Sequence, residues 1–308
     1  MHTTANSLDD LARNIDAQVA EEIARMNRLL QQVGEMNGQI MAAETGGQPA
    51  NDLRDQRDQL VNEISRIAAV TVEERDDGSV DLILNGRTVV TRSSVQEFST
   101  TLTETDSGYR IGVVTSGNLW NVELPEGSLQ GLLSSRDEVV DDVRGKLDEL
   151  ARTIISSVND LHVQGQTGSS NGLLFFTGDN LHNIEINPML VDDPSLVATS
   201  RSGEEGDADV AHEIAALADS VVPGTGLTIG DAYRGVVTNV ASRRASFEFL
   251  VENQQASVQA VEAKIASVSG VNIDEEAANM VRYQNTYNAA ARVISTVQEM
   301  FDSLINMI

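Results

Sequence analysis

The C-terminal segment carries an uninterrupted heptad repeat, which restricts its fold more than any other feature of the sequence. Beyond residue 272, apolar and amide residues follow one another in alternating steps of four and three positions up to the last residue. This spacing predicts a helix that packs along one seam as a coiled coil. The flanking positions are also apolar, which favours assembly between chains over the alternative, packing on its own domain. The predicted assembly seam consists of Ile273, Ala277, Met280, Gln284, Tyr287, Ala291, Ile294, Gln298, Phe301, Ile305 and Ile308.

The start of this helix has its own signals. Asn272 is the predicted N-cap, Glu275 is its capping-box partner, and acidic residues fill the first turn, where the helix dipole favours negative charge. Gly270 is expected to end the helix before it. Residues 270–308 therefore form a predicted C-terminal coiled-coil assembly domain.

Helical periodicity also dominates the N-terminal part of the chain. Apolar residues recur at three- and four-residue steps over residues 7–43, which predicts a long amphipathic helix. The sequence TGGQP interrupts it, and a second helix is expected over residues 51–69 with Asn51 as its N-cap. The two helices are predicted to fold back on each other as a hairpin.

The period changes to two over residues 70–126. Strands are expected at residues 70–72, 80–84, 87–91, 97–104, 109–115 and 119–124, with a hairpin turn at Asn85-Gly86. Helix resumes over residues 127–165, loops with two or three short strands follow at about 166–206, and further helices are expected at 208–219 and 228–269. The predicted fold is mainly α, with long helices in a discontinuous helical domain (7–69 and 127–269) and an inserted β-rich domain (70–126).

Composition excludes several classes of function. The formal net charge is -26, so phosphate backbones and anionic membrane surfaces are poor partners, and no apolar run reaches the length of a membrane span. The chain has no cysteine, which excludes disulfides, thiolate metal sites and cysteine nucleophiles. No secretory signal peptide opens the chain, so export would require another route.

Candidate catalytic residues are few and isolated. His212-Glu213 resembles the start of a zinc-protease HExxH helix, but Ala216 occupies the position of the second metal ligand. Acidic pairs could in principle serve glycoside hydrolysis, yet their spacing is typical of solvated helix faces and loops. We expect no enzyme activity, no cofactor and no metal. The acidic groups are Asp137-Glu138, Asp141-Asp142, Asp148-Glu149 and Glu204-Glu205-Gly206-Asp207.

Three stretches resemble the flagellar hook-associated protein 1 family and together span nearly the whole chain. They are NDLRDQRDQLVNEIS, then GSLQGLLSSRDEVVDDVRGKLDELARTIISSVNDLHVQGQTG with LLFFTGD after it, and the ending SGVNIDEEAANMVRYQNTYNAAARVISTVQEMFDSLINMI. The last stretch is shared more loosely with other axial flagellar proteins, whereas the first two are more specific.

The resemblance implies a structural subunit of the bacterial flagellum at the hook–filament junction, needed for flagellum assembly and motility. Its implied partners are the hook protein, the second junction protein, other copies in a ring and an export chaperone on the C-terminal helix. It would be cytoplasmic before type III export and extracellular afterwards.

One departure and two alternatives accompany this interpretation. Family members begin with a further segment that includes a helix pairing with the C-terminal helix, whereas this chain opens at Met1-His2-Thr3-Thr4, so the family's N-terminal segment is expected to be absent. Another axial component, such as the second junction protein or a flagellin, is the alternative within the class. An enzyme carried on an axial scaffold is the alternative outside it.

Overall fold

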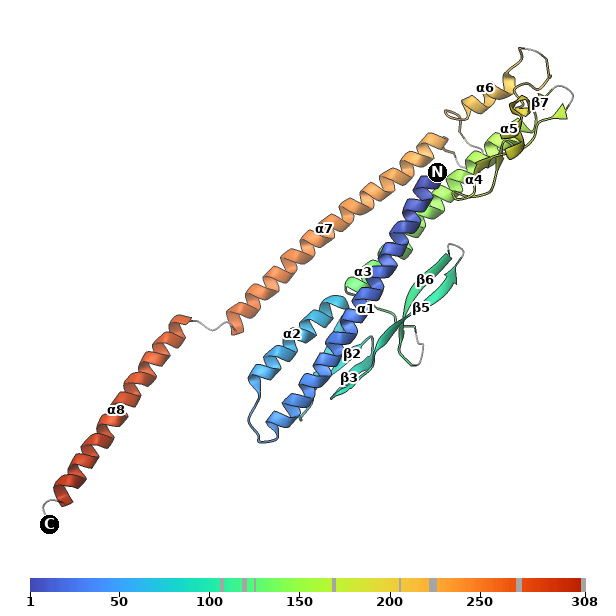
Figure 1. Cartoon of the computed structure of the whole chain (residues 1–308). Helices are drawn as coiled ribbons and strands as arrows, with labels where there is room; N and C mark the ends of the chain where they lie inside the picture. The colour runs from blue at the N-terminus through green and yellow to red at the C-terminus, as the bar shows by residue number, and fades with distance from the viewer. Residues whose placement is uncertain are drawn as a thin grey trace. The chain divides into compact units, whose positions relative to one another are not determined.

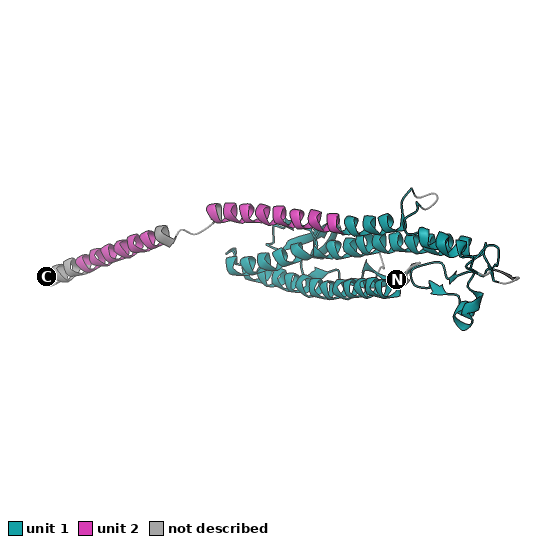
Figure 2. Cartoon of the chain, turned by 90° about the horizontal axis from the view of Figure 1, so that it is seen from above, with its two compact units in different colours: residues 1–240 teal, residues 241–308 magenta. Residues whose placement is uncertain are grey.

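The structure is a computed structural model that describes residues 1–105, 108–117, 121–124, 126–167, 170–204, 206–221, 226–269 and 273–305. It confirms a mainly α fold with a β-rich region inserted between helices and a long C-terminal helix. The chain divides into two units, residues 1–240 and 241–308 (Figure 2). The first unit holds every strand that the structure describes, and the second consists of the end of one long helix and the whole of the last one.

The predicted N-terminal hairpin is confirmed. Helix α1 (His2–Glu44) runs for 43 residues, and α2 (Asn51–Ile67) returns along it (Figure 1). The apolar stripe of α1 is buried from Ile15 to Ile40, and Val61, Ile64 and Ile67 of α2 are buried as well. Burial of these two stripes, rather than helix propensity, is what stabilises helices of this length.

The joint between the two helices differs from its prediction. Asn51 lies inside α2, and the N-cap residue is Ala50, whose N–H donates to the Glu44 carboxylate over 2.8 Å. Arg54 donates to the same carboxylate through Nε and Nη2, each over 2.7 Å. The end of α1 therefore fixes the start of α2 through one charged group, and no side-chain cap is needed.

We expect Glu44 to make folding sensitive to acid. The Arg54 side chain, followed by the Ala50 N–H, lowers the pKa of Glu44 from 4.5 to about 2. A depressed carboxyl pKa contributes stability that is present above about pH 4.5 and is lost as the pH falls toward 2. Glu44→Gln should therefore lower the urea midpoint at pH 7, and the difference from the parent should shrink below pH 4.5. Glu35→Gln, an exposed change on the same helix, is the control, and a difference that is constant with pH would contradict the assignment.

The β-rich region contains a four-stranded antiparallel sheet in the order β1-β2-β3-β4. Its strands are β1 (Val70–Glu74), β2 (Val80–Leu84), β3 (Arg87–Thr91) and β4 (Ser94–Val95). Asn85 and Gly86, at φ 46° and 76°, form the predicted turn between β2 and β3. Strands β5 (Phe98–Thr105) and β6 (Gly108–Thr115) form a separate antiparallel pair.

The strand predicted at residues 119–124 is wrong over its described part. Residues 118–120 lie outside the described residues, and in 121–124 Asn121 makes only an isolated bridge to Val114. The chain leaves the sheet there because Leu124 enters the core and Gly127 turns the backbone at φ 106°. A Cβ on Gly127 would lie 2.3 Å from the Ile67 carbonyl oxygen, so only glycine fits this approach.

One hydrophobic core joins the β-rich region to the helices. Buried residues of α1, α2, the sheet and β6 belong to the same cluster, which includes Val33, Ile64, Leu82 and Val113. The two ends of residues 70–126 also lie close together, because the Ala69 N–H donates to the Glu126 carbonyl over 3.4 Å. The division of the chain into helical, inserted and C-terminal domains stays a prediction.

Two asparagines of α1 bind the backbone of the β-rich region. Asn37 is fully buried; its amide donates to the carbonyls of Val80 and Arg92 and accepts from the Val80 N–H. Asn27 makes the equivalent pair of bonds with Phe98. Each side-chain amide thus makes the two hydrogen bonds that a neighbouring strand would make to one residue, which holds the β-rich region against α1.

We expect Asn37→Ala to destabilise the protein by about 2–3 kcal/mol, because it leaves the buried N–H and carbonyl of Val80 without partners. Asn27→Ala is the matched control. Its bonds are only partly buried, so water can replace them and the expected loss is about 1 kcal/mol. Urea unfolding followed by circular dichroism measures both, and equal losses would show that the burial of Asn37 is unimportant.

The helix predicted over residues 127–165 is continuous but not uniform. It comprises α3 (Ser128–Ser134), a π-helical segment η1 (Ser135–Val140) and α4 (Asp141–His162). Within the wider turn, the buried Arg136 donates to Asp16 of α1 and to the Ile111 carbonyl of β6. Nearby, Arg144 donates to Asp9 over 2.5 Å. Buried cations therefore connect this helix to α1.

A loop region covers the end of α4. It contains the short pairs β7 (Gln166–Thr167) with β8 (Ser170–Asn171) and β9 (Phe176–Thr177) with β10 (Glu185–Ile186), then α5 (Pro188–Asp192), the 3-10 turn η2 (Pro194–Leu196) and α6 (Asp209–Ala216). A second, smaller core lies here, built from Ala5, Leu147, Leu150 and Leu181.

The last two helices are α7 (Ile229–Ser269) and α8 (Ile273–Ile305). The beginning of α7 packs on the second core through Ile229, Ala232 and Val236. The predicted helix end at Gly270 and the predicted N-cap Asn272 lie outside the described residues.

Candidate assembly surface

The predicted assembly seam lies on α8, and its described side chains are exposed. Met280, Tyr287 and Ile294 are 71%, 75% and 60% exposed, and Ala277, Gln284 and Ala291 are also exposed. Ile273, Gln298, Phe301 and Ile305 belong to α8, but their side chains are not among those described, and Ile308 lies outside the described residues. A row of large apolar side chains in contact with water is unusual for a soluble surface and marks a binding surface.

A second exposed apolar row was missed by the sequence analysis. In the part of α7 that belongs to the second unit, Phe247, Val251, Val258, Val261 and Ile265 are each more than half exposed. Their three- and four-residue spacing could have revealed them, but apolar residues on several faces of this helix, such as Phe249, obscure the period.

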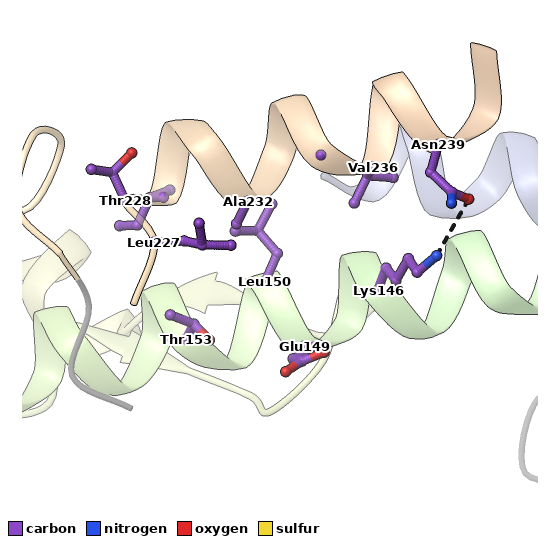
Figure 3. Close-up of a pocket in the computed structure, with 11 residues that line it drawn as sticks. Lys146, Glu149, Leu150, Thr153, Leu227, Thr228, Ala232, Val236 and Asn239 are labelled. Carbon is purple, nitrogen blue, oxygen red and sulfur yellow. Dashed lines mark hydrogen bonds between the residues drawn. The ribbon is translucent and has the colours of Figure 1, made fainter. Parts of the chain in front are cut away.

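A groove separates α4 from the first turns of α7. It has a volume of about 510 Å³ and is lined by both helices and the chain entering α7. Figure 3 shows Lys146 and Asn239 pointing toward each other across it, with 3.3 Å between Nζ and Oδ1. Lys146 also pairs with Asp142 over 2.8 Å. Since Lys146 is paired within the chain and the small Ala232 and Gly235 line the gap, the groove is a loosely packed helix contact.

His212, the one candidate for metal chemistry, lacks the necessary neighbours. Its Nδ1 lies 2.7 Å from the Ala208 carbonyl oxygen at the start of α6, so the ring bonds its own helix. Among the residues that the structure describes, no group of three or more His, Asp or Glu side chains is placed to hold a metal ion.

In the part of the chain that the structure describes, the acidic groups likewise do not converge on one site. Asp137 pairs with Arg136 and Arg110, and Asp141 with Arg110 and Arg144. Asp148 accepts from the Leu181 N–H over 2.8 Å. These carboxylates hold helices and loops in place. Glu205 of the last group lies outside the described residues.

Asp207 of the same group has a structural role. The hydroxyls of Ser200 and then Ser202 bind its carboxylate, at 2.6 and 2.7 Å, and lower its pKa to about 2. The carboxylate thus stays ionised at neutral pH and closes the loop before α6.

Comparison with known protein families identifies the family of the chain that carries this surface. The family described as "Flagellar hook-associated protein FlgK helical domain" matches residues 1–176. The chain belongs to this flagellar hook-associated protein family. The match covers α1, α2, the β-rich region and α4, which are the elements around the main core. A second family, described as "Flagellar basal body rod FlgEFG protein C-terminal", matches residues 264–307 and so includes nearly all of the α8 seam.

Curated relatives agree with the family over nearly the whole chain. Flagellar hook-associated protein 1 of Salmonella typhimurium is 25% identical over 407 aligned residues, covering 99% of this chain and 74% of the relative. The protein of the same name from Escherichia coli K12 is 23% identical and covers 99% of this chain and 73% of the relative. The Bacillus subtilis protein is 25% identical, with 98% and 68% covered.

A solved structure supports the fold. The flagellar hook junction protein FlgK from Burkholderia pseudomallei superposes with a TM-score of 0.52 at 23% identity, covering 57% of this chain and a third (33%) of that protein. Flagellar hook-associated proteins are structural proteins of the bacterial flagellum. None of the described helices has both the length and the apolar character needed to cross a bilayer.

Proposed function

We propose that this chain is a structural subunit of the flagellar hook–filament junction, and that α8 is the surface by which it assembles. The single observation that supports this most directly is the exposed heptad seam of α8 in a chain of this family. A seam of Met280, Tyr287 and Ile294 in water is unfavourable for an isolated subunit and becomes favourable once neighbouring helices cover it.

The proposed partners are of one kind, the helical ends of other axial subunits. We propose contacts with the hook protein, with the second junction protein and with further copies in a ring, because residues 264–307 match the family described for the C-terminal part of flagellar basal body rod proteins. An export chaperone is a further proposed partner of α8. It would cover the same apolar seam in the cytoplasm before type III export, and the extracellular flagellum would be the final location.

The role is proposed to be non-catalytic. Two of the candidate residues, His212 and Asp148, are hydrogen-bonded to backbone groups of the chain itself. His212→Ala should leave assembly unchanged. A hydrolytic activity lost in that variant would favour an enzyme carried on an axial scaffold.

The test is Ile294→Asp, introduced into the gene at its own locus. Ile294 is 60% exposed in the subunit, so the variant should fold normally, but assembly would bury an unpaired carboxylate. We expect hooks without filaments and loss of swimming, while the purified variant keeps the circular dichroism spectrum of the parent.

Thr296→Asp is the matched control. Thr296 lies two residues further on and faces away from the seam, and its side chain is exposed. The same charge there should leave swimming intact. Normal swimming with Ile294→Asp, or equal loss with both variants, would refute the assembly role of the seam.

A further inference from the structure

The end of α7 carries a heptad seam of its own, separate from α8. Within the second unit its positions follow steps of three and four without a slip, and five of the seven are apolar. This set, the distal α7 seam, consists of Arg244, Phe247, Val251, Gln254, Val258, Val261 and Ile265. All seven side chains are exposed. A heptad repeat of this kind fits one other helix of the same period, packed knobs into holes.

From this seam we infer a second interface, in which the distal α7 seam pairs in parallel with the same seam of a second copy of this chain. The charged residues beside the seam indicate which helix it binds. In a parallel, in-register coiled coil, the residue that precedes an a position lies beside the residue whose number is higher by five on the other helix. Arg243 precedes the a position at Arg244. Arg243 then lies beside Glu248 of the second copy, and the symmetry of the pair repeats this contact on the other side.

The antiparallel arrangement of the same two seams is disfavoured by charge. Aligning Phe247 with Ile265 of the second copy would set Glu248 beside Glu262 of that copy. Like charges at such flanking positions oppose pairing and select against that orientation. The signs of the flanking residues therefore specify a parallel pair.

The two polar members of the seam fit the same arrangement. Gln254 would lie opposite Gln254 of the second copy, and a single polar pair in an apolar seam fixes register at some cost in stability. Arg244 stands at the first position, where its Nε already donates to Glu248 over 2.8 Å. Its aliphatic stem can cover the seam while the guanidinium stays at the edge.

The experiment measures the oligomeric state of the whole chain by sedimentation equilibrium over a range of concentrations. We expect a reversible dimer, and we expect Val251→Asp to raise its dissociation constant at least tenfold. Ala263→Asp places the same charge on the opposite face of α7 and should leave the constant unchanged. A chain that is monomeric throughout, or a dimer indifferent to Val251→Asp, would overturn the inference.

Orientation and independence from α8 need two further variants. The parent has no cysteine, so Val261→Cys reports a single contact. Parallel pairing brings the two introduced thiols together and should give a disulfide dimer on oxidation. Antiparallel pairing places residue 261 opposite Val251 of the second copy. The two introduced cysteines then lie about 15 Å apart along the helix axis, and no disulfide can form. Ile294→Asp should leave the dimer intact. Loss of the dimer in that variant would assign self-association to α8, whereas the swimming assay tests the proposed function separately.

Discussion

Replacing Arg136 with methionine is expected to lower the free energy of unfolding by about 3–5 kcal/mol, the range for removing one partner of a buried ion pair. Arg136 is 5% exposed and donates to Asp16, to Asp137 and to the Ile111 carbonyl. Burial alone would lower the pKa of its guanidinium, but the hydrogen bonds that it donates to Asp137 and Asp16 outweigh burial and raise the pKa. Methionine fills a similar volume, so the loss comes from the unpaired Asp16 and carbonyl rather than from a cavity.

Arg13→Met on α1 is the control for this experiment. The Arg13–Asp10 pair is about as short, at 2.5 Å, but both side chains are largely exposed, so the expected loss is below about 1 kcal/mol. The free energy of unfolding of both variants is measured in urea, which is uncharged and, unlike guanidinium chloride, does not screen the ion pairs. Adding Asp16→Leu to Arg136→Met should recover part of the loss. Equal effects of Arg136→Met and Arg13→Met would contradict the role of burial.

Replacing His162 with alanine is expected to cost a similar amount, about 3–5 kcal/mol, and to release the loop region from the end of α4. His162 is fully buried. Its Nε2 accepts from the Ala198 N–H over 3.0 Å, since an amide can only donate, and Nδ1 donates to the Leu173 carbonyl. The ring also meets Phe175 edge-on at 5.3 Å between centroids. One imidazole thus joins both ends of the loop.

Amide hydrogen exchange locates this effect. His162→Ala should lose protection over residues 170–200 and keep it in the middle of α1. His212→Ala, an exposed histidine of α6, should change neither. A uniform loss of protection in His162→Ala would mean that the loop and the main core unfold as one unit.

Features with a local cause were predictable from the sequence. The helices of the hairpin follow from their periodic apolar stripes, and the Asn85-Gly86 turn follows from two residues that tolerate positive φ. The start of α2 was misassigned because Glu44, on another helix, replaces the side-chain cap. The π-helical turn was missed for a similar reason. Its Arg136 is bonded to Asp16, 120 residues earlier, and no local pattern announces such a contact.

The candidate surface was predictable in part. The α8 seam is a repeat within one segment, so spacing alone located it, and its assembly role stays a prediction. The spacing of the distal α7 seam is also regular, but spacing alone does not show which part of α7 is exposed, because Val236 and Val251 look equivalent in the sequence. The structure distinguishes these two residues: Val236 packs on the smaller core, whereas Val251 is exposed to water.

The length of α1 has a mechanical consequence. Its first turns, at Ala5, belong to the smaller core, and its middle, from Ile15 to Val33, belongs to the larger one. A pull applied to either core therefore reaches the other along α1, a helix of 43 residues with about 65 Å of continuous backbone hydrogen bonds. Such a strut resists stretching and bending far better than two domains on a linker would. The first unit, which is built around α1, therefore transmits force along this helix as one stiff piece.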